Sequence, residues 1–205
     1  MGNKLWIFGD SFSVKLPSHG QKFTYWFEYL ANELGVRLEN TSFGGKSTQH
    51  ILFDIIDNLN NIKSGDYVSI GLSETRRDFL PLSTAIDLGL LNNPNNYNHD
   101  YIYSSGGMYF EGLDQERQRI YNEYLIEFRN ENGNELYNFY NRLAQSLATH
   151  LNGLGCKVIW WNQDEWSLHE NWTQHSNGKI IDGHWSPNGH KTFYLKMLEN
   201  FKKNF

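Results

Sequence analysis

Two short polar segments carry the residue types that nucleophilic catalysis uses. Gly9-Asp10-Ser11 places a serine hydroxyl directly after an apolar run near the N-terminus, and Asp182-Gly183-His184 places a carboxylate and an imidazole near the C-terminus. A serine attacks a carbonyl carbon when a histidine within hydrogen-bond reach takes its proton and a carboxylate holds the other ring nitrogen. These residue types suit acyl transfer, provided that the fold brings the two segments together.

Two more segments carry groups that could stabilise negative charge. Gly44-Gly45-Lys46-Ser47-Thr48 and Gly71-Leu72-Ser73-Glu74 each follow a stretch that favours a strand. Backbone N–H groups at glycine turns and helix N-termini point donors at anionic groups. A phosphate-binding loop is disfavoured, because its motif needs glycine five residues before the second glycine and Asn40 stands there.

The elements that must position these segments are predicted from apolar periodicity. Strands are expected at residues 5–8, 37–43, 67–72 and 157–161, and helices at residues 24–34, 47–59, about 115–152 and 187–201. Strands that alternate with helices predict a three-layer α/β/α domain with a mostly parallel sheet. Ligands bind such sheets at the carboxyl ends of the strands, which is where the polar segments fall.

Length and composition predict one domain over residues 1–205. The chain has 205 residues, of which 39% are hydrophobic, enough for a single sizeable core. Residues 79–112 break the alternation, and we interpret them as an insertion that either overhangs the sheet edge as a lid or forms a plain surface excursion.

Charge and cysteine content narrow the classes of partner. The net charge of -5 does not favour nucleic-acid binding, and the single cysteine allows no internal disulfide. No apolar run approaches the ~20 residues of a membrane span, and no signal peptide is recognisable at the start. We therefore expect a cytoplasmic or otherwise soluble protein, and the sequence leaves its oligomeric state open.

At its polar segments the chain resembles the SGNH (GDSL-like) hydrolases. The resemblance rests on Gly9-Asp10-Ser11 and on the Asp182-Gly183-His184 segment before a final helix. The family is described by a series of short sequence motifs, called blocks, and the resemblance follows their order over nearly the whole chain. It implies a flavodoxin-like fold and a serine esterase that acts on a small-molecule, lipid or glycan ester without cofactor or metal. It further implies that Ser11 is the nucleophile, His184 the base and then the acid, and Asp182 the carboxylate that orients His184.

The same resemblance assigns the groups of the oxyanion hole. The glycine of the family's second block maps to Gly45, with Gly44 one residue away as the alternative. The family has Gly-x-Asn-Asp in its third block, where this chain has Ser73 in place of the asparagine side chain. The Ser73 hydroxyl could take that role, or Arg76 or Arg77 just beyond it could contribute.

The last block also departs from the family. Its usual spacing is Asp-x-x-His, whereas Asp182 and His184 are separated by one residue, so Asp164 after the fourth strand is the reserve acid. His190 is expected to form structural hydrogen bonds near the start of the last helix. Trp185 and Trp166 are candidates for the substrate pocket, and core packing is favoured for Trp160 or Trp161.

Two alternative functions stay open at the level of the sequence. The missing third-block asparagine favours a protein that keeps the fold for binding or structure with weakened turnover. A metal-dependent hydrolase could use four histidines together with Asp182, namely His169, His175, His184 and His190. Their spacing matches no fixed metal motif.

Overall fold

The computed structural model describes residues 2–15, 23–73, 77–81, 101–105, 135, 138–162, 172–174 and 180–205. At residues 77–81, 101–105, 172–174 and 180–183 the description covers the backbone alone. Within these residues, strands and helices alternate along the chain as the apolar periodicity predicts.

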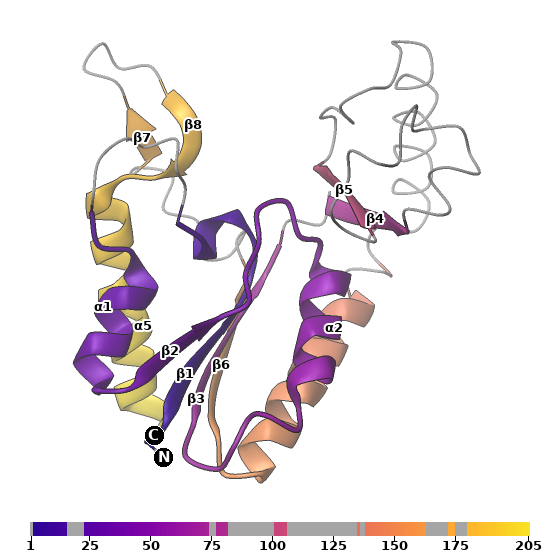
Figure 1. Ribbon diagram of the computed structural model, residues 1–205, viewed down its shortest axis with the longest axis vertical. Coiled ribbons are helices and arrows are strands. Elements are labelled where there is room, and N and C mark those ends of the chain that lie inside the picture. The colour runs from indigo at the N-terminus through magenta and orange to yellow at the C-terminus, as the bar shows by residue number, and fades with distance from the viewer. Residues whose placement is uncertain are drawn as a thin grey trace.

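A four-stranded parallel sheet forms the centre of the molecule (Figure 1). Its strands lie in the order β2-β1-β3-β6, and their bounds are β1 (Lys4–Phe8), β2 (Arg37–Asn40), β3 (Tyr67–Leu72) and β6 (Lys157–Asn162). The described strands thus follow the start of the flavodoxin-like order. Because Phe8 pairs with Ile70 and Leu72 pairs with Asn162, the carboxyl ends of β1, β3 and β6 lie side by side.

Helices cover both faces of the sheet, which confirms the three-layer α/β/α prediction (Figure 1). On one face α1 (Trp26–Leu34) contacts α5 (Pro187–Asn204), and on the other lie α2 (Thr48–Asn58) and a helix of residues 138–153. Strand alternation explains the two cores, since Leu5 and Ile7 pack on the side of α1 and α5 while Trp6 and Phe8 pack on the side of α2.

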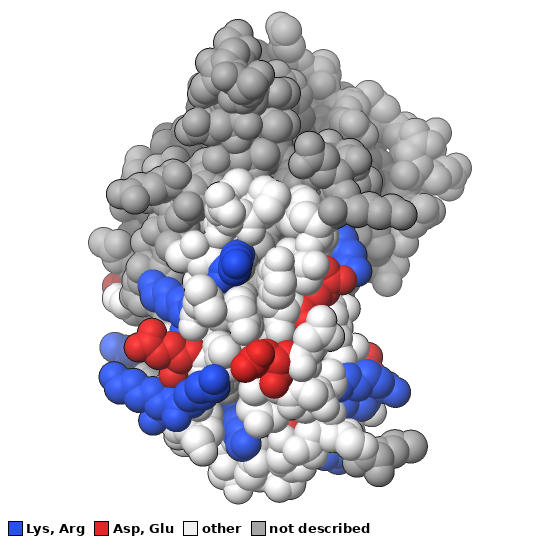
Figure 2. Space-filling model, turned by 90° about the vertical axis from the view of Figure 1, so that its left-hand side faces the viewer, with Lys and Arg blue, Asp and Glu red and all other residues white. Residues whose placement is uncertain are grey.

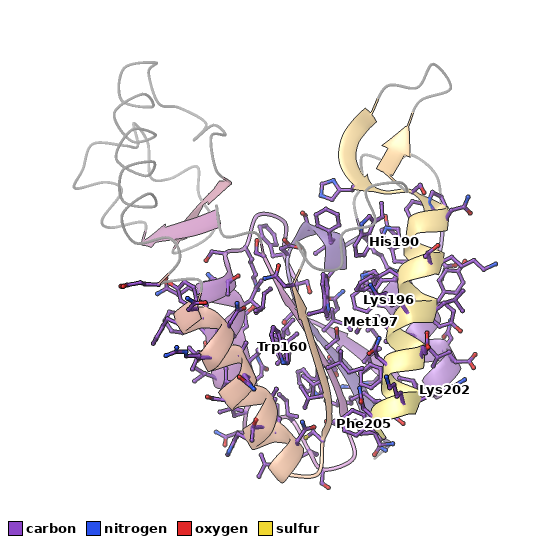
Figure 3. The ribbon with its side chains drawn as sticks, turned by 180° about the vertical axis from the view of Figure 1, so that it is seen from behind. Trp160, His190, Lys196, Met197, Lys202 and Phe205 are labelled. Carbon is purple, nitrogen blue, oxygen red and sulfur yellow. The ribbon has the colours of Figure 1, made fainter. Side chains whose placement is uncertain are left out.

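Aromatic side chains fill much of the core under α5. Trp161 lies across Gly71, where an added Cβ would be only 2.4 Å from its Cζ2 atom, and its indole N–H donates to Ser69 Oγ at 3.1 Å. The buried Met197 belongs to this cluster, while the half-buried Trp160 packs against the opposite one, beside the helix of residues 138–153 (Figure 3). The expectation of core packing therefore holds for Trp161.

The helices begin where polar side chains cap them. Ser47 caps α2 by accepting from the His50 backbone N–H at 3.3 Å, and Ser186 caps α5 by accepting from the Gly189 N–H at 3.1 Å. Pro187 stands in the first turn of α5, where a missing N–H costs nothing. None of the helices in the described ranges is long and apolar enough to cross a membrane.

Charged residues of both signs are interspersed over the side of the molecule where α1 and α5 lie (Figure 2). Several form ion pairs, among them Lys4 with Glu39 and, more weakly at 3.9 Å, Lys202 with Glu33. Ion pairs at or near the surface contribute only ~0–1 kcal/mol each, so the apolar cores hold this side together.

Two short antiparallel sheets accompany the central sheet, and the apolar periodicity predicts neither of them. The 79–112 insertion contributes to a two-stranded antiparallel sheet of β4 (Arg77–Pro81) and β5 (Tyr101–Ser105). Residues 182–184, where no strand is predicted, belong to β8 (Ile180–Trp185), which pairs antiparallel with β7 (Trp172–Gln174). The helix expected from about residue 115 is described from 138 onward, and its first part lies outside the described residues.

Candidate active site

Ser11 begins a single 3-10 turn, η1 (Ser11–Ser13), at the carboxyl end of β1. Asp10 shapes this turn, because its side chain accepts from the Phe12 backbone N–H at 3.0 Å and its carbonyl accepts from the Ser13 N–H at 2.9 Å. Ser11 is 7% exposed, and its buried hydroxyl has no hydrogen-bond partner among the described residues.

Gly9 is required by the close packing of this turn. A Cβ at Gly9 would lie 2.6 Å from Ser13 Oγ, closer than real Cβ atoms approach, and 3.0 Å from Ser13 Cβ. The Gly-Asp-Ser pattern thus has a local structural cause in its first two residues. Its third residue, Ser11, makes neither contact and remains available for chemistry.

The strand that carries His184 reaches the same end of the sheet. The imidazole of His184 packs against the Phe12 ring with 5.1 Å between the ring centres, and Phe12 follows Ser11 directly. β8 contacts η1, so residues far apart in the sequence meet beside the predicted nucleophile (Figure 1). The structure thus places His184 against Phe12, the residue that follows Ser11.

The glycine loop between β2 and α2 closes another side of this neighbourhood. An added Cβ at Gly44 would lie 4.0 Å from Ser11 Cβ, while Gly45 adopts a φ of 84° in the left-handed region that favours glycine. The Phe43 N–H donates to the Gly9 carbonyl at 3.4 Å and keeps the loop beside η1. Gly44 is thus the glycine whose packing against Ser11 is observed.

Ser73 occupies the carboxyl end of the next strand. It follows Ile70 by three residues, as Ser11 follows Phe8, and Phe8 and Ile70 are register partners. The Thr48 hydroxyl, in the first turn of α2, donates to the Ser73 carbonyl at 3.1 Å. The Ser73 hydroxyl itself is buried and has no partner among the described residues.

Three buried serine hydroxyls at this edge of the sheet therefore lack hydrogen bonds within the described part of the chain, those of Ser11, Ser13 and Ser73. A buried polar group without a partner costs ~1–3 kcal/mol. Such groups are rare in folded proteins, and a catalytic role is one of the explanations for them. Their concentration around the predicted nucleophile marks this edge as the candidate active site.

Trp185 and His190 are buried rather than open to a surface. Trp185 is 2% exposed and packs against Phe12 and Phe193, with 5.0 and 4.5 Å between ring centres. The sequence favours it for the substrate pocket, but it supports the site from the core. His190 is 3% exposed and contacts the rings of Tyr25 and Trp185, so it is a packing residue at the start of α5.

Other predicted site residues are described in part or not at all. Asp182 lies in β8, two residues before His184, and only its backbone is described. The same holds for Arg77 in β4. The remaining candidates lie outside the described residues, namely Arg76, Asp164, Trp166, His169 and His175.

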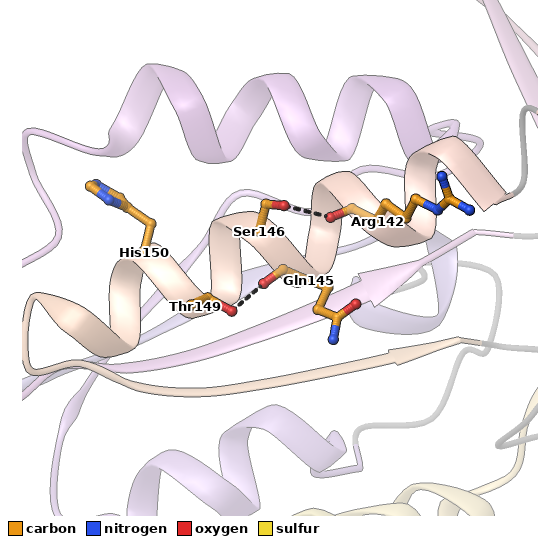
Figure 4. A pocket seen from close by; sticks show the side chains of 5 residues that line it. All are labelled: Arg142, Gln145, Ser146, Thr149 and His150. Atoms are coloured by element: carbon orange, nitrogen blue, oxygen red, sulfur yellow. Dashed lines mark hydrogen bonds between the residues drawn. The ribbon is translucent and has the colours of Figure 1, made fainter.

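A concave area lies on the exposed face of the helix of residues 138–153 (Figure 4). Two of its hydroxyls bond to their own helix, with Ser146 donating to the Arg142 carbonyl and Thr149 to the Gln145 carbonyl, both at 2.8 Å. The described side chains include no group of three or more His, Cys, Asp or Glu placed to hold a metal. This face therefore offers no arrangement comparable to that around Ser11.

Sequence reasoning missed Lys46, which is 6% exposed and lies two residues after Gly44. Its ammonium group contacts the Thr41 carbonyl and the carboxylate of Asp54. In the sequence, Lys46 stands out only through its partial match to a phosphate-binding loop. No local pattern in the sequence indicates that Lys46 pairs with Asp54, which lies within the next helix.

No protein-family profile and no curated protein matches the sequence, and the solved structures that are similar to it are distant. The chain is similar over 98% of its length to 99% of a member of the lipolytic protein G-D-S-L family from Veillonella parvula, with 14% identity and a TM-score of 0.39. It is similar over 98% to 95% of an α/β hydrolase enzyme from the metagenome of Lake Arreo in Spain, with 15% identity and a TM-score of 0.42. The chain is similar over 98% of its length to 65% of the length of a carbohydrate esterase, with 11% identity and a TM-score of 0.37. At these values the roles of individual residues must be argued from this chain's own geometry.

Proposed function

We propose that the protein is a serine hydrolase that cleaves an acyl or acetyl ester by the chemistry of the SGNH hydrolases. The observation that carries the proposal is the buried Ser11 hydroxyl, which has no partner among the described residues and lies beside Gly44 and the ring pair of Phe12 and His184. A hydroxyl held there attacks a carbonyl carbon once a neutral imidazole accepts its proton.

Proton transfer is assigned to His184 and Asp182. In the proposed reaction His184 takes the proton of Ser11 and returns it to the leaving alcohol, and then activates the water that releases the acyl group. Asp182 stands two residues earlier in β8, and residues two apart in a strand belong to the same face. That relation supports Asp182 as the carboxylate that orients His184.

Stabilisation of the negative charge on the developing oxyanion is assigned to the loop and the turn beside Ser11. The backbone N–H of Ser11 and one N–H of the Gly44-Gly45 turn are the proposed donors, and the Ser73 hydroxyl is the third. Donors fixed in a site that excludes water act strongly, because they need no reorganisation when charge develops. The burial of Ser11 and Ser73 supports this assignment.

The nucleophile is tested by covalent labelling and by substitution. We expect a fluorophosphonate to label the protein on Ser11, and Ser11→Ala to abolish labelling and lower kcat on p-nitrophenyl acetate by at least ~10³-fold, since members of a triad act as a unit. Ser146→Ala is the matched control, because Ser146 is exposed on the helix of residues 138–153. A Ser11→Ala protein that keeps half of the wild-type rate would refute the assignment.

The second candidate is a protein that keeps this fold for binding. It is favoured by Ser73, whose hydroxyl reaches less far than the asparagine amide of the SGNH pattern. Under this hypothesis the folded protein neither reacts with the fluorophosphonate nor hydrolyses esters.

Repeating the assay in a chelator tests the metal-dependent alternative, under which activity disappears when divalent ions are removed and returns when they are restored.

A further inference from the structure

Lys46 is a buried cation inside the glycine loop beside Ser11. Its side chain is 8% exposed, its Nζ donates to the Thr41 carbonyl at 2.7 Å, and it forms an ion pair with the Asp54 carboxylate. A buried ammonium group is costly unless it is both paired and hydrogen-bonded. These two partners therefore fix the position of the Lys46 side chain.

The two partners belong to different elements. Thr41 is attached to the edge of β1, because its N–H donates to the Ile7 carbonyl at 3.0 Å and its hydroxyl donates to the same oxygen at 3.1 Å. Asp54 lies within α2, where His50 Nε2 also approaches it at 3.5 Å. The Lys46 ammonium group thus links the start of the loop to the helix that follows it.

The Gly44-Gly45 turn lies between these attachment points. Glycines have no side chain with which to pack, so flanking contacts must hold the turn in the position where a Cβ added at Gly44 would lie 4.0 Å from Ser11 Cβ. The Lys46 N–H closes the turn by donating to the Phe43 carbonyl at 3.4 Å. Lys46 therefore contacts the loop through its backbone and its side chain, on both sides of the glycine pair.

We infer that Lys46 is a positioning residue, whose ion pair with Asp54 holds the Gly44-Gly45 N–H groups where the oxyanion develops. The inference rests on the proposed function. It assigns Lys46 no contact with the substrate and no part in proton transfer. The Lys46–Asp54 pair therefore stabilises the transition state more than the bound ester, because the oxyanion forms in the transition state and the ester carries no such charge.

The experiment compares Lys46→Met with Lys157→Met in the full-length protein. Lys157 is the matched control, because it is a half-buried lysine at the start of β6 whose Nζ donates to the Tyr67 hydroxyl at 2.9 Å, at the opposite end of the sheet from Ser11. For each variant kcat, KM, the rate of fluorophosphonate labelling and the melting temperature are measured. We expect Lys46→Met to lower kcat and the labelling rate by roughly 10- to 100-fold with KM within about threefold, and Lys157→Met to keep kcat within about twofold.

Asp54→Asn provides the second variant, since it removes the ion pair and keeps the shape of the side chain. We expect it to lower kcat, and we expect the double variant to be no slower than Lys46→Met alone, because both changes break the same link. If Lys46→Met does not fold, the kcat of Asp54→Asn tests the inference in its place. A kcat within about twofold of the wild type then refutes the inference.

The two proposals fail in different ways. A wild-type protein that neither labels on Ser11 nor hydrolyses esters refutes the proposed function and, with it, the inference. A wild-type protein that labels on Ser11 while Lys46→Met keeps kcat within about twofold refutes the inference alone. Additive losses in the double variant also refute it, because Lys46 and Asp54 would then act independently.

Discussion

Ser73 lies at the carboxyl end of β3, one strand away from Ser11. Its backbone carbonyl is held by Thr48, whereas its buried hydroxyl has no partner among the described residues. That combination is what an oxyanion donor requires, namely a fixed backbone and an uncommitted donor. The role of Ser73 can be tested separately from that of Ser11.

We predict that Ser73→Ala lowers kcat by ~10²-fold with little change in KM, as the loss of one oxyanion donor does in serine hydrolases. Ser73→Asn supplies the amide of the SGNH pattern and should retain or raise kcat if the buried site accepts the larger side chain. Steady-state kinetics and thermal unfolding of both variants provide the measurement. Equal kcat for Ser73→Ala and the wild type would show that the hydroxyl is not a donor.

His184 and His190 belong to different environments, although they are close in the sequence. We predict that activity rises with pH as the His184 imidazole loses its proton, because the imidazole must be neutral to accept the serine proton. His184→Asn should abolish activity without loss of stability. His190→Asn should lower the melting temperature and largely spare kcat, because His190 is 3% exposed among aromatic rings. The reverse ranking in kcat would move the base to His190.

At the scale of elements, the contact of β3 with β6 helps to position Ser73. Trp161 in β6 lies across Gly71 in β3, and only glycine leaves room for the indole. The indole also bonds to Ser69 in β3, which fixes one strand relative to the other. Ser73 follows Gly71 by two residues, so its position depends on this packing.

We predict that Gly71→Ala destabilises the protein by ~1–3 kcal/mol, because an added methyl group must displace a buried ring in a close-packed core. Gly153→Ala is the control, since a Cβ there meets nothing within 4 Å and Gly153 ends the helix of residues 138–153. It should be neutral or slightly stabilising. Urea unfolding of the two variants measures the difference, and equal stability would show that β3 and β6 can move apart without cost.

At the scale of the whole molecule, the single cysteine reports on global unfolding. Cys156 is buried, and its thiol donates to the Lys63 carbonyl at 3.3 Å. Burial, and secondarily the negative charge of Asp66, raises the pKa of the Cys156 thiol above its ordinary range. The folded protein therefore holds the thiol proton more tightly than the unfolded chain does.

We predict that Cys156 reacts slowly with a thiol reagent at pH 8 in the native protein and rapidly in urea, because the thiolate is the reactive form. The raised pKa also contributes stability that is fully present below the unfolded value of ~8.5 and is lost as pH rises through the folded pKa. Cys156→Ser should show a smaller loss of stability between pH 8 and 10 than the wild type. Rapid native labelling would contradict the burial of this thiol.

The sequence by itself determined the elements whose patterns are local. The bounds of β3 follow from an apolar run after the Ser64-Gly65-Asp66 turn, and those of α2 follow from an apolar stripe that begins at a serine cap. Ser11 at the end of β1 could be singled out for the same reason, since strand, turn and serine are adjacent in the chain. The order of layers then follows, because buried strands must be covered on both faces.

Only the tertiary structure decided how distant segments meet. β8 was not predicted, because Asp182 and Gly183 interrupt its apolar pattern and its pairing with β7 is not visible in either strand alone. Likewise, nothing local to Trp185 distinguishes a pocket wall from the core in which it packs, and nothing local to Lys46 reveals that its charge is buried against Asp54. Periodicity records which face of an element is apolar, whereas the partner of a buried charge or ring depends on contacts that exist only after the layers have packed.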